Sequence, residues 1–389
     1  MVKKLQPKLR FRGFTDAWEP RKLKSLLQES TQTSTDKEIL SVTVANGIYP
    51  AREGARESNP GESLEKYKVV HENDIVYNSM RLWQGAIAIS HYEGIVSPAY
   101  TVCIPSVHIN PDFISYLLKR PAALRMFYSL SQGNSKDTLI LKYPLFSTIK
   151  FSLPAGREQY HIARLLRCVD QLIDAEKRKL DLLQKKKTAL LRQIFERKLR
   201  FKGYDNPWNR HKLGSITDSY SGGTPPVSDS SYYGGDIPFI RSAEIANEST
   251  ELFITQSGLA ASSAKRVKKG DVLYALYGAN SGNASFAKLD GAINQAVLSI
   301  RAEKGFSNSF IMYWLQRSKN AIIGTFLQGG QGNLSGSIVK KLSIQTPRID
   351  EQERIGLFFI KIDSLITAET RKLDLLIDKK KALLQKMFV

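Results

Sequence analysis

The chain of 389 residues repeats itself, and this duplication constrains its fold more than any other feature. LRFRGFTDAWEPRKLKSL begins at Leu9 and matches LRFKGYDNPWNRHKLGSI, which begins at Leu199, at eight of 18 positions. A second pair of segments, 158–195 and 351–388, is identical at 20 of 38 positions. The repeat is too long for a solenoid. We therefore expect two copies of one unit, each a globular part of about 150 residues followed by a helix of about 40 residues.

The globular parts favour a mixed α+β fold. Short runs rich in β-formers alternate with Gly, Asn, Ser and Pro, and apolar spacing predicts helices at 113–130 and 309–323. The predicted strands are Asp74 to Tyr77, Ala86 to Ile89, Ala99 to Ile104, Asp271 to Tyr277 and Ala296 to Ile300. We expect two similar α/β domains at 1–155 and 199–348, joined by two long spacer helices at 156–198 and 349–389.

The two helices carry matching apolar seams with alternating spacings of three and four residues, as in a coiled coil. Polar residues interrupt each seam at equivalent places, Glu176 and Lys187 in the first helix and Glu369 and Lys380 in the second. A parallel in-register pair would oppose like charges, which is costly in a partly buried seam. We predict an antiparallel, pseudo-twofold pair in which Glu176 meets Lys380 and Lys187 meets Glu369.

Each helix of 38 residues would be about 57 Å long at about 1.5 Å per residue. An antiparallel pair of that length puts one globular domain at each end. Half-sites read from one face of DNA lie about 34 Å apart. The arrangement favours two recognition domains held apart by a rigid spacer, although a basic helical hairpin could also serve as a scaffold.

The charge balance points to a polyanion. The net charge is +20 and the isoelectric point is near 9.7, and nucleic acid is the commonest partner for such a chain. A membrane surface would need an amphipathic or lipid anchor, and the sequence shows neither, nor a secretory signal or an apolar span. Cys103 and Cys168 are the only cysteines, which indicates a reducing, cytoplasmic setting.

Motifs for catalysis are missing from the sequence. Thr224-Pro225-Pro226-Val227 is the nearest match to an amino-methyltransferase motif but lacks its amide or acid and its aromatic residue. No GxxxxGK[ST] loop occurs, and the five histidines lack metal-ligand spacing. We expect no catalytic residues, no metal site and no cofactor bound by this chain.

DNA recognition needs basic side chains for phosphates and Arg, Asn or Gln for base edges. Polar loops at equivalent places in the two copies offer such residues, whereas we interpret Gly85, Gly94, Gly282 and Gly291 as structural. The first-domain candidates are Arg52, Arg56, Lys66, Lys68, Asn78, Arg81, Trp83 and Gln84. The second-domain candidates are Thr224, Tyr232, Arg241, Lys265, Arg266, Tyr277, Asn280, Ser281 and Asn283.

On these segments the chain resembles the specificity subunits of type I restriction–modification systems. The resemblance rests on SGGTPP with YYGGDIPFIRSAEI, GDVLYALYGANSGNASF, GAINQAV and QGGQGNLSGSIVKKLSIQTP in the second copy. In the first copy it rests on YNSMRLWQGAIAIS, GIVSPAYTV and LPAGREQ. The first copy has Val44-Ala45-Asn46-Gly47-Ile48 where the second has GGTP, so loop contacts transfer less securely there.

The resemblance implies a non-catalytic subunit with two target-recognition domains that bind double-stranded DNA at a bipartite target. It also implies two modification subunits, which use S-adenosylmethionine and dock on the helices, and restriction subunits that use ATP and Mg. Two alternatives stay open: a self-contained methyltransferase or nuclease with divergent motifs, and a basic coiled-coil adaptor.

Overall fold

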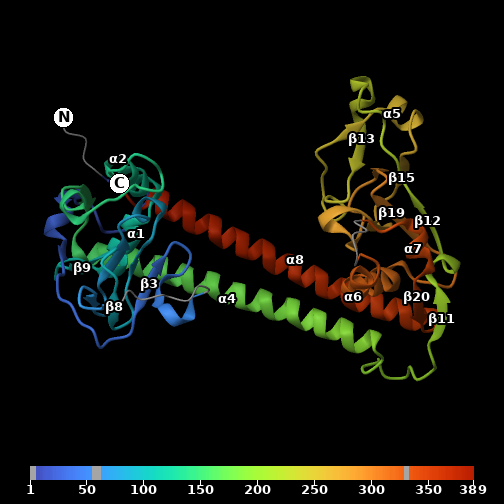
Figure 1. Ribbon diagram of the computed structural model, residues 1–389, viewed down its shortest axis with the longest axis horizontal. Coiled ribbons are helices and arrows are strands. Elements are labelled where there is room, and N and C mark those ends of the chain that lie inside the picture. Colours follow the sequence, from blue (N-terminus) through green and yellow to red (C-terminus); the bar gives the residue numbers. More distant parts are fainter. Residues whose placement is uncertain (1–5, 55–62, 328–332) are drawn as a thin grey trace. The chain divides into compact units, whose positions relative to one another are not determined.

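The computed structural model describes residues 6–54, 63–327 and 333–389. These form two compact units, Met1–Lys177 with Lys372–Val389, and Arg178–Arg371. Two unbroken helices, α4 (Gly156–Phe195) and α8 (Ile349–Lys386), each contribute to both units (Figure 1). They lie within the ranges 156–198 and 349–389 that the sequence predicts for the spacer helices.

The first unit contains a four-stranded antiparallel sheet in the order β2-β9-β6-β7. Its strands are Leu27–Glu29, Tyr100–Pro105, Ile75–Asn78 and Ile87–Ile89. Three further pairs surround it: β1 (Glu19–Lys22) with β10 (Lys150–Leu153), β3 (Leu40–Thr43) with β4 (Gly47–Pro50), and β5 (Lys68–Val70) with β8 (Gly94–Val96). The helices are α1 (Pro111–Leu118), α2 (Pro121–Leu130) and α3 (Tyr143–Phe146).

The second unit repeats this plan. Its antiparallel sheet has the order β12-β19-β16-β17, with strands Thr217–Ser221, Val297–Ala302, Val272–Ala275 and Ala284–Phe286. β11 (Asn209–Lys212) pairs with β20 (Ser343–Thr346) as β1 pairs with β10. A second sheet, β14-β13-β18-β15, comprises Phe253–Ile254, Tyr233–Ile240, Gly291–Ile293 and Lys265–Val267. The helices are α5 (Gln256–Ala260), α6 (Asn308–Phe326) and α7 (Gly336–Lys341).

The mixed α+β class and the duplication are confirmed. One helix prediction differs, because the segment 113–130 forms two helices that break before Pro121. Proline lacks an amide hydrogen and is tolerated in the first turn of a helix, so it starts α2 instead of continuing α1. The copies also differ in the extent of one sheet. In the second unit β14, β13, β18 and β15 form one sheet, whereas in the first unit β3-β4 and β5-β8 are two pairs linked by an isolated parallel bridge between Ile39 and Ile95.

Equivalent contacts hold each unit to the start of its own long helix. Arg10 makes a bidentate ion pair with the buried Glu158 on α4, with nitrogen–oxygen distances of 2.8 and 2.7 Å. Arg200 pairs in the same way with the buried Glu351 on α8, at 3.0 and 2.7 Å. Each arginine lies in the repeated LRF motif and each glutamate in the repeated EQ motif. The same ion pair therefore joins these two motifs in both copies.

The C-terminal end of one long helix packs into the core of each unit: that of α8 in the first unit and that of α4 in the second. Phe388, two residues after the end of α8, stacks on Phe113 with ring centroids 5.3 Å apart and lies edge-on to Trp18. In the second unit Phe195, at the end of α4, packs against Phe310 at 5.1 Å and edge-on to Trp208. Such aromatic contacts add to the area that is buried.

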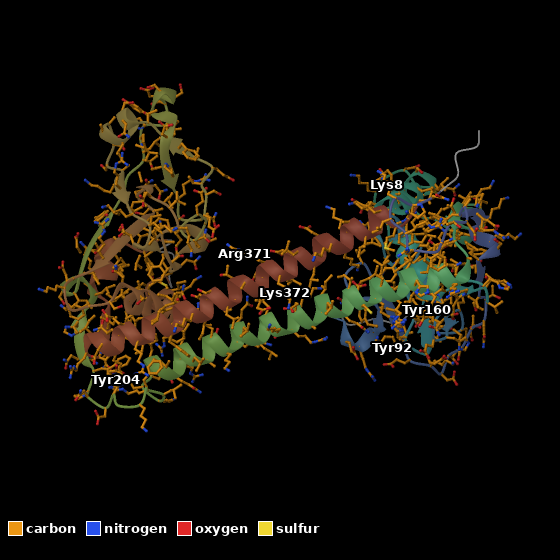
Figure 2. The ribbon with its side chains drawn as sticks, turned by 180° about the vertical axis from the view of Figure 1, so that it is seen from behind. Lys8, Tyr92, Tyr160, Tyr204, Arg371 and Lys372 are labelled. Carbon is orange, nitrogen blue, oxygen red and sulfur yellow. The ribbon has the colours of Figure 1, made fainter. Side chains whose placement is uncertain are left out.

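Ion pairs define how α4 and α8 run within each unit. In the first unit Glu176 pairs with Lys372, which Figure 2 labels on α8, and Asp170 pairs with Lys380. The partner numbers sum to 548 and 550. In the second unit Lys179 pairs with Glu369 and Lys187 with Asp363, with the same sums of 548 and 550. Constant sums mean antiparallel helices in both units.

The register differs from the predicted one, whose partner numbers sum to 556. The difference of about seven residues is one heptad, and an apolar a/d repeat is unchanged by such a shift. Glu176, Lys187, Glu369 and Lys380 all make ion pairs, but with partners other than those predicted. Their partners, such as Lys372 and Asp363, lie beside the seam.

Candidate nucleic-acid interface

The SGGTPP segment of the second unit follows β12 and lies against the end of β18 and the bend before β15. A Cβ atom on Gly222 would stand 1.7 Å from the carbonyl oxygen of Ile293, and one on Gly223 would stand 2.6 Å from Cβ of Ser263. Only glycine allows this approach. It brings Thr224 to Gln295, where the hydroxyl donates to the side-chain oxygen at 2.5 Å.

Two basic residues lie in the edge strand β15, beside this loop. Lys265 and Arg266 are exposed, and the Arg266 guanidinium donates to Oε1 of Gln256 at 3.1 Å. The hydroxyl of Tyr220, in β12, donates to the backbone carbonyl of Arg266 at 2.9 Å. Exposed cations on a sheet edge are free to contact phosphate groups. Thr224, Gln295, Lys265 and Arg266 thus form one candidate contact surface.

The turn after β16 forms a second polar loop around η6 (Gly278–Asn280). Asn283 donates from Nδ2 to Oδ1 of Asn280 at 3.3 Å and accepts at 2.5 Å from Nζ of Lys319 on α6. Tyr277 is partly buried against the core. Ser281 is buried, and its hydroxyl is engaged by backbone carbonyls of the same turn, so Ser281 shapes the turn from within.

Arg241 is held by carboxylates. It contacts the buried Glu244 through Nε and Nη2 at 3.0 Å each, and Glu251 through Nη2 at 2.7 Å. Burial alone would raise the pKa of Glu244, but hydrogen bonds from Arg241 and from the backbone of Glu251 outweigh it and lower the pKa to about 2. The cluster closes the loop that follows β13. Tyr232 lies half-buried in η5 (Ser230–Tyr232) before that strand.

The first unit places its loop candidates around η3 (Leu82–Gln84), which follows β6 as η6 follows β16. Asn78 caps the turn by accepting from the amide of Met80 at 3.0 Å. Arg81 is 45% exposed, with Asp137 at 4.0 Å. Trp83 lies edge-on to Tyr128 of α2, and its indole nitrogen is buried without a hydrogen-bond partner among the described residues. Gln84 is half-buried.

The remaining first-unit candidates lie on other elements. Arg52 is 75% exposed and pairs with Glu38 at 3.2 Å, and Lys66 is exposed before β5. Lys68, in β5, is partly buried and contacts Glu29 at 3.5 Å. Arg56 lies outside the described residues. The first unit therefore groups Asn78, Arg81, Trp83 and Gln84 around one turn. Lys68 reaches the strand beside Asn78, because its Nζ donates to the carbonyl oxygen of Tyr100 at 3.2 Å and Tyr100 pairs with Asn78.

The repeated glycines have structural roles. Gly85 and Gly282 have φ values of +98° and +81°, which side chains rarely adopt. A Cβ on Gly94 would stand 2.5 Å from the carbonyl oxygen of Glu38, and one on Gly291 would stand 2.5 Å from that of Pro238. Both therefore allow close backbone approach.

Sequence reasoning missed Gln295, Lys319 and Tyr220. Gln295 lies in GAINQAV, one of the segments behind the resemblance, but its partner Thr224 is 71 residues away. Lys319 lies on a helix that apolar spacing assigns to the core. No local sequence pattern predicts the contact of Gln295 with Thr224 or that of Lys319 with Asn283.

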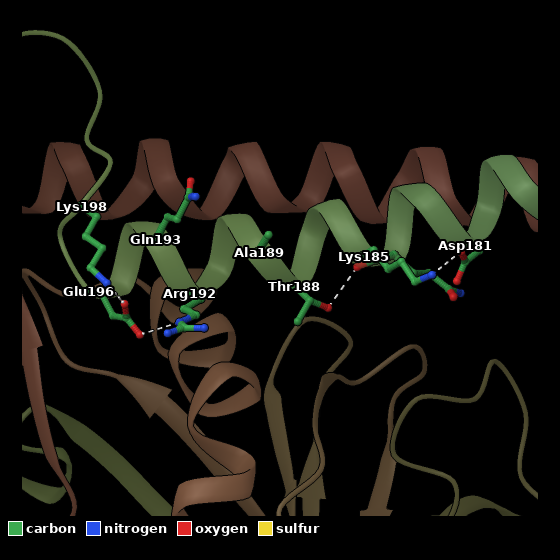
Figure 3. Close-up of a pocket in the computed structure, with 9 residues that line it drawn as sticks. Asp181, Lys185, Thr188, Ala189, Arg192, Gln193, Glu196 and Lys198 are labelled. Carbon is green, nitrogen blue, oxygen red and sulfur yellow. Dashed lines mark hydrogen bonds and ion pairs between the residues drawn. The ribbon is translucent and has the colours of Figure 1, made fainter.

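Two surfaces of the long helices are also exposed. A groove of about 580 Å³ runs along the C-terminal half of α4 and the residues just after it (Figure 3). Most of its lining residues are polar, and their charges largely pair with one another, as Asp181 pairs with Lys185. Four leucines are exposed at repeat-equivalent positions. They are Leu172 (54%) and Leu375 (61%) in the first unit, and Leu365 (45%) and Leu182 (65%) in the second.

Within the described ranges no cluster of three or more His, Cys, Asp or Glu side chains could hold a metal ion. Among the helices of those ranges, none is long and apolar enough to cross a membrane.

Two copies of one mixed α/β domain, each with a different polar loop on a common scaffold, define a two-domain sequence-recognition protein. Comparison with known proteins identifies the family to which the chain belongs. Residues 15–185 and 205–376 each match the family described as type I restriction modification DNA specificity domain. The chain therefore belongs to this family, and it is a DNA-specificity subunit and not a catalytic one.

Individual relatives agree with this assignment. The putative type I restriction enzyme MjaX specificity subunit of Methanocaldococcus jannaschii is 24% identical over 91% of this chain and 89% of its own length. The MjaIX specificity subunit of the same organism is 26% identical over 43% of this chain and 41% of its own length.

Solved structures share the fold. The type I restriction–modification S subunit from M. genitalium has a TM-score of 0.66 and 15% identity, with 99% of each chain covered. A chain from work on complex assembly and conformational transition of the type I system has a TM-score of 0.57 and 19% identity, over 95% of this chain and 97% of that one.

Proposed function

We propose that the chain reads a bipartite, asymmetric DNA target, with one half-site for each recognition domain and an unread spacer between them. The proposal rests on one observation: the two domains share a fold but carry different side chains in the equivalent loop. The turn after the second strand in sequence of each main sheet, β6 or β16, carries Arg81, Trp83 and Gln84 in the first unit and Asn280 and Asn283 in the second. Different side chains on one frame would select different bases.

Affinity for DNA would come from phosphate contacts. The net charge of +20 is large for a chain of this size. Lys265 and Arg266 are exposed beside the SGGTPP loop, and Lys66 is exposed before β5. Such contacts position the protein without selecting sequence, and they weaken as salt rises. Arg241 is a weaker candidate for base contact because two carboxylates already occupy its guanidinium.

The exposed leucines support docking of two modification subunits, one on each pair. With Ile173 at an a position of the seam, Leu172 occupies g and Leu375 occupies c, positions that an antiparallel pair presents on one face. Leu365 and Leu182 have the same relation in the second unit. Both pairs sum to 547, close to the 548 and 550 of the ion pairs. Two equivalent apolar patches suit two copies of one partner.

The rest of the proposed complex lies on other chains. The modification subunits would bind S-adenosylmethionine and methylate adenine, and the restriction subunits would use ATP and Mg. This chain would supply DNA recognition and docking surfaces, in the cytoplasm.

Comparing the methylomes of the host with and without this gene tests the proposal. We expect loss of one methylated motif made of two short half-sites and a fixed spacer. Purified complex should bind a duplex carrying that motif more tightly than one with either half-site scrambled, and the logarithm of affinity should fall linearly with the logarithm of salt concentration.

Domain exchange supplies the control. Replacing residues 199–348 with the same domain of another family member should change one half-site and leave the other. A lost motif that is continuous, or a chimera that changes both half-sites, would contradict the proposal. Stoichiometric S-adenosylmethionine binding by the isolated chain would favour a self-contained enzyme.

A further inference from the structure

In the second unit, hydrogen bonds connect the helix pair to the loop around η6. Asp363 on α8 pairs with Nζ of Lys187 on α4 at 2.6 Å. The same lysine donates to Oε1 of Gln316 on α6 at 3.2 Å. Gln316 in turn donates from Nε2 to the carbonyl oxygen of Ala284 at 3.0 Å. Ala284 begins β17, directly after the loop.

The same face of α6 holds the loop at a second point. Nζ of Lys319 donates to Oδ1 of Asn283, and a Cβ on Gly282 would stand 3.0 Å from Cγ of Lys319. Gln316, Lys319 and Asn283 line a groove of about 310 Å³ together with Ser242 and Ser285. The side chains that face the groove are therefore oriented by α6.

The first unit keeps only part of this arrangement. Tyr116, Asp170 and Lys380 repeat Tyr313, Asp363 and Lys187, with tyrosine–aspartate distances of 2.7 and 2.8 Å. At the offset of 197 residues that relates the two tyrosines, Gln316 corresponds to Lys119.

Lys119 does not continue the chain of hydrogen bonds. Among the described residues, no hydrogen bond joins Lys119 to β7. The pKa of Lys119 is lowered by desolvation and by the like charge of Lys380. A lysine cannot accept a hydrogen bond from a second lysine, so the link to the loop is broken at this position.

We propose that Lys187 and Gln316 are positioning residues for the second half-site, which set the η6 loop from the helix pair, whereas the η3 loop of the first domain is positioned by its own domain. This inference rests on the proposed function. Because helix and loop share one network, contacts that α4 and α8 make with a partner affect discrimination at one half-site more than at the other.

The test uses the full chain assembled with its modification subunits and duplexes carrying single base-pair changes in either half-site of the methylated motif. Gln316→Leu keeps the size of the side chain and removes both hydrogen bonds. We expect mismatch penalties in the second half-site to fall about two- to tenfold, the size of one to two hydrogen bonds. Penalties in the first half-site should stay as in the wild type.

Two further variants complete the design. Gln316→Glu still accepts from Lys187 but has no donor for the Ala284 carbonyl, so it should also relax the second half-site. Lys119→Leu is the matched control in the first repeat and should leave the second half-site unchanged. Unchanged penalties in both Gln316 variants, or an equal fall at both half-sites, would overturn the inference. A wild-type complex with no preference for the motif would instead overturn the proposed function.

Discussion

At the scale of single residues, close backbone approach determines whether the second domain can form its SGGTPP loop. Gly222→Ala would put a methyl group 1.7 Å from the Ile293 carbonyl oxygen. We expect a loss of about 1–3 kcal/mol in unfolding free energy, since overpacking forces the backbone to move, together with weaker binding to the second half-site. Denaturant unfolding and duplex binding measure the two effects.

The control for this substitution is another glycine of the same unit. Gly324 lies in α6, where a Cβ would meet nothing within 4 Å. Gly324→Ala should stabilise the protein by up to about 1 kcal/mol because alanine favours helix. If both substitutions have the same effect, the close approach at Gly222 is not what the loop requires.

The buried Glu244 predicts a pH dependence. Its pKa of about 2 lies below the ordinary value of 4.5, so its stabilising contribution is complete above about pH 4.5 and is lost as the pH falls through 2. Glu244→Gln removes the ionisable group. We expect the difference in unfolding free energy between wild type and variant to shrink from pH 5 to pH 2. Glu303→Gln, on an exposed side chain, is the control, and a difference that grows as pH falls would contradict the assignment.

At the scale of elements, the ion pairs of α4 and α8 make the register testable. A double-mutant cycle that reverses Glu176 and Lys372 should show a coupling energy of about 0.5–1 kcal/mol, which is modest because Lys372 is 55% exposed. The same cycle with Glu176 and Lys380 should show almost none, because Lys380 pairs with Asp170. Coupling in the second cycle alone would restore the register that sums to 556.

At the scale of the whole molecule, duplication predicts how many partners dock. Replacing Leu172 and Leu375 with Gln should remove one proposed docking patch and leave Leu182 with Leu365. We expect the complex with modification subunits to change from two copies per chain to one, as measured by native mass spectrometry. Ile377→Gln is the control, because Ile377 is 43% exposed but corresponds to Gln184 in the other repeat. Loss of both copies, or of neither, would contradict independent patches.

The sequence alone determined much of the architecture. Identity between distant segments revealed two copies of one unit. The spacing of the apolar seams revealed the long helices, and the charges that interrupt the seams indicated that the helices run antiparallel. These features are periodic or repeated, so they can be recognised without coordinates. The resemblance in SGGTPP and GAINQAV pointed to the family for the same reason. The break before Pro121 could also have been expected from local backbone chemistry.

Only the tertiary structure decided the register and the surroundings of the candidate contacts. A shift of seven residues leaves an apolar heptad repeat unchanged, so apolar spacing alone does not distinguish the predicted register from the observed one. In the observed register the polar residues of the seam pair with charged residues beside it. Residue type made Arg241 and Ser281 candidates for DNA contact, but hydrogen bonds to nearby parts of the chain already engage both. Arg241 donates to Glu244 and Glu251, and the hydroxyl of Ser281 donates to the carbonyl oxygen of Leu276. Thr224 and Gln295 meet across 71 residues because Gly222 allows two backbones to touch, which is a property of the folded chain alone.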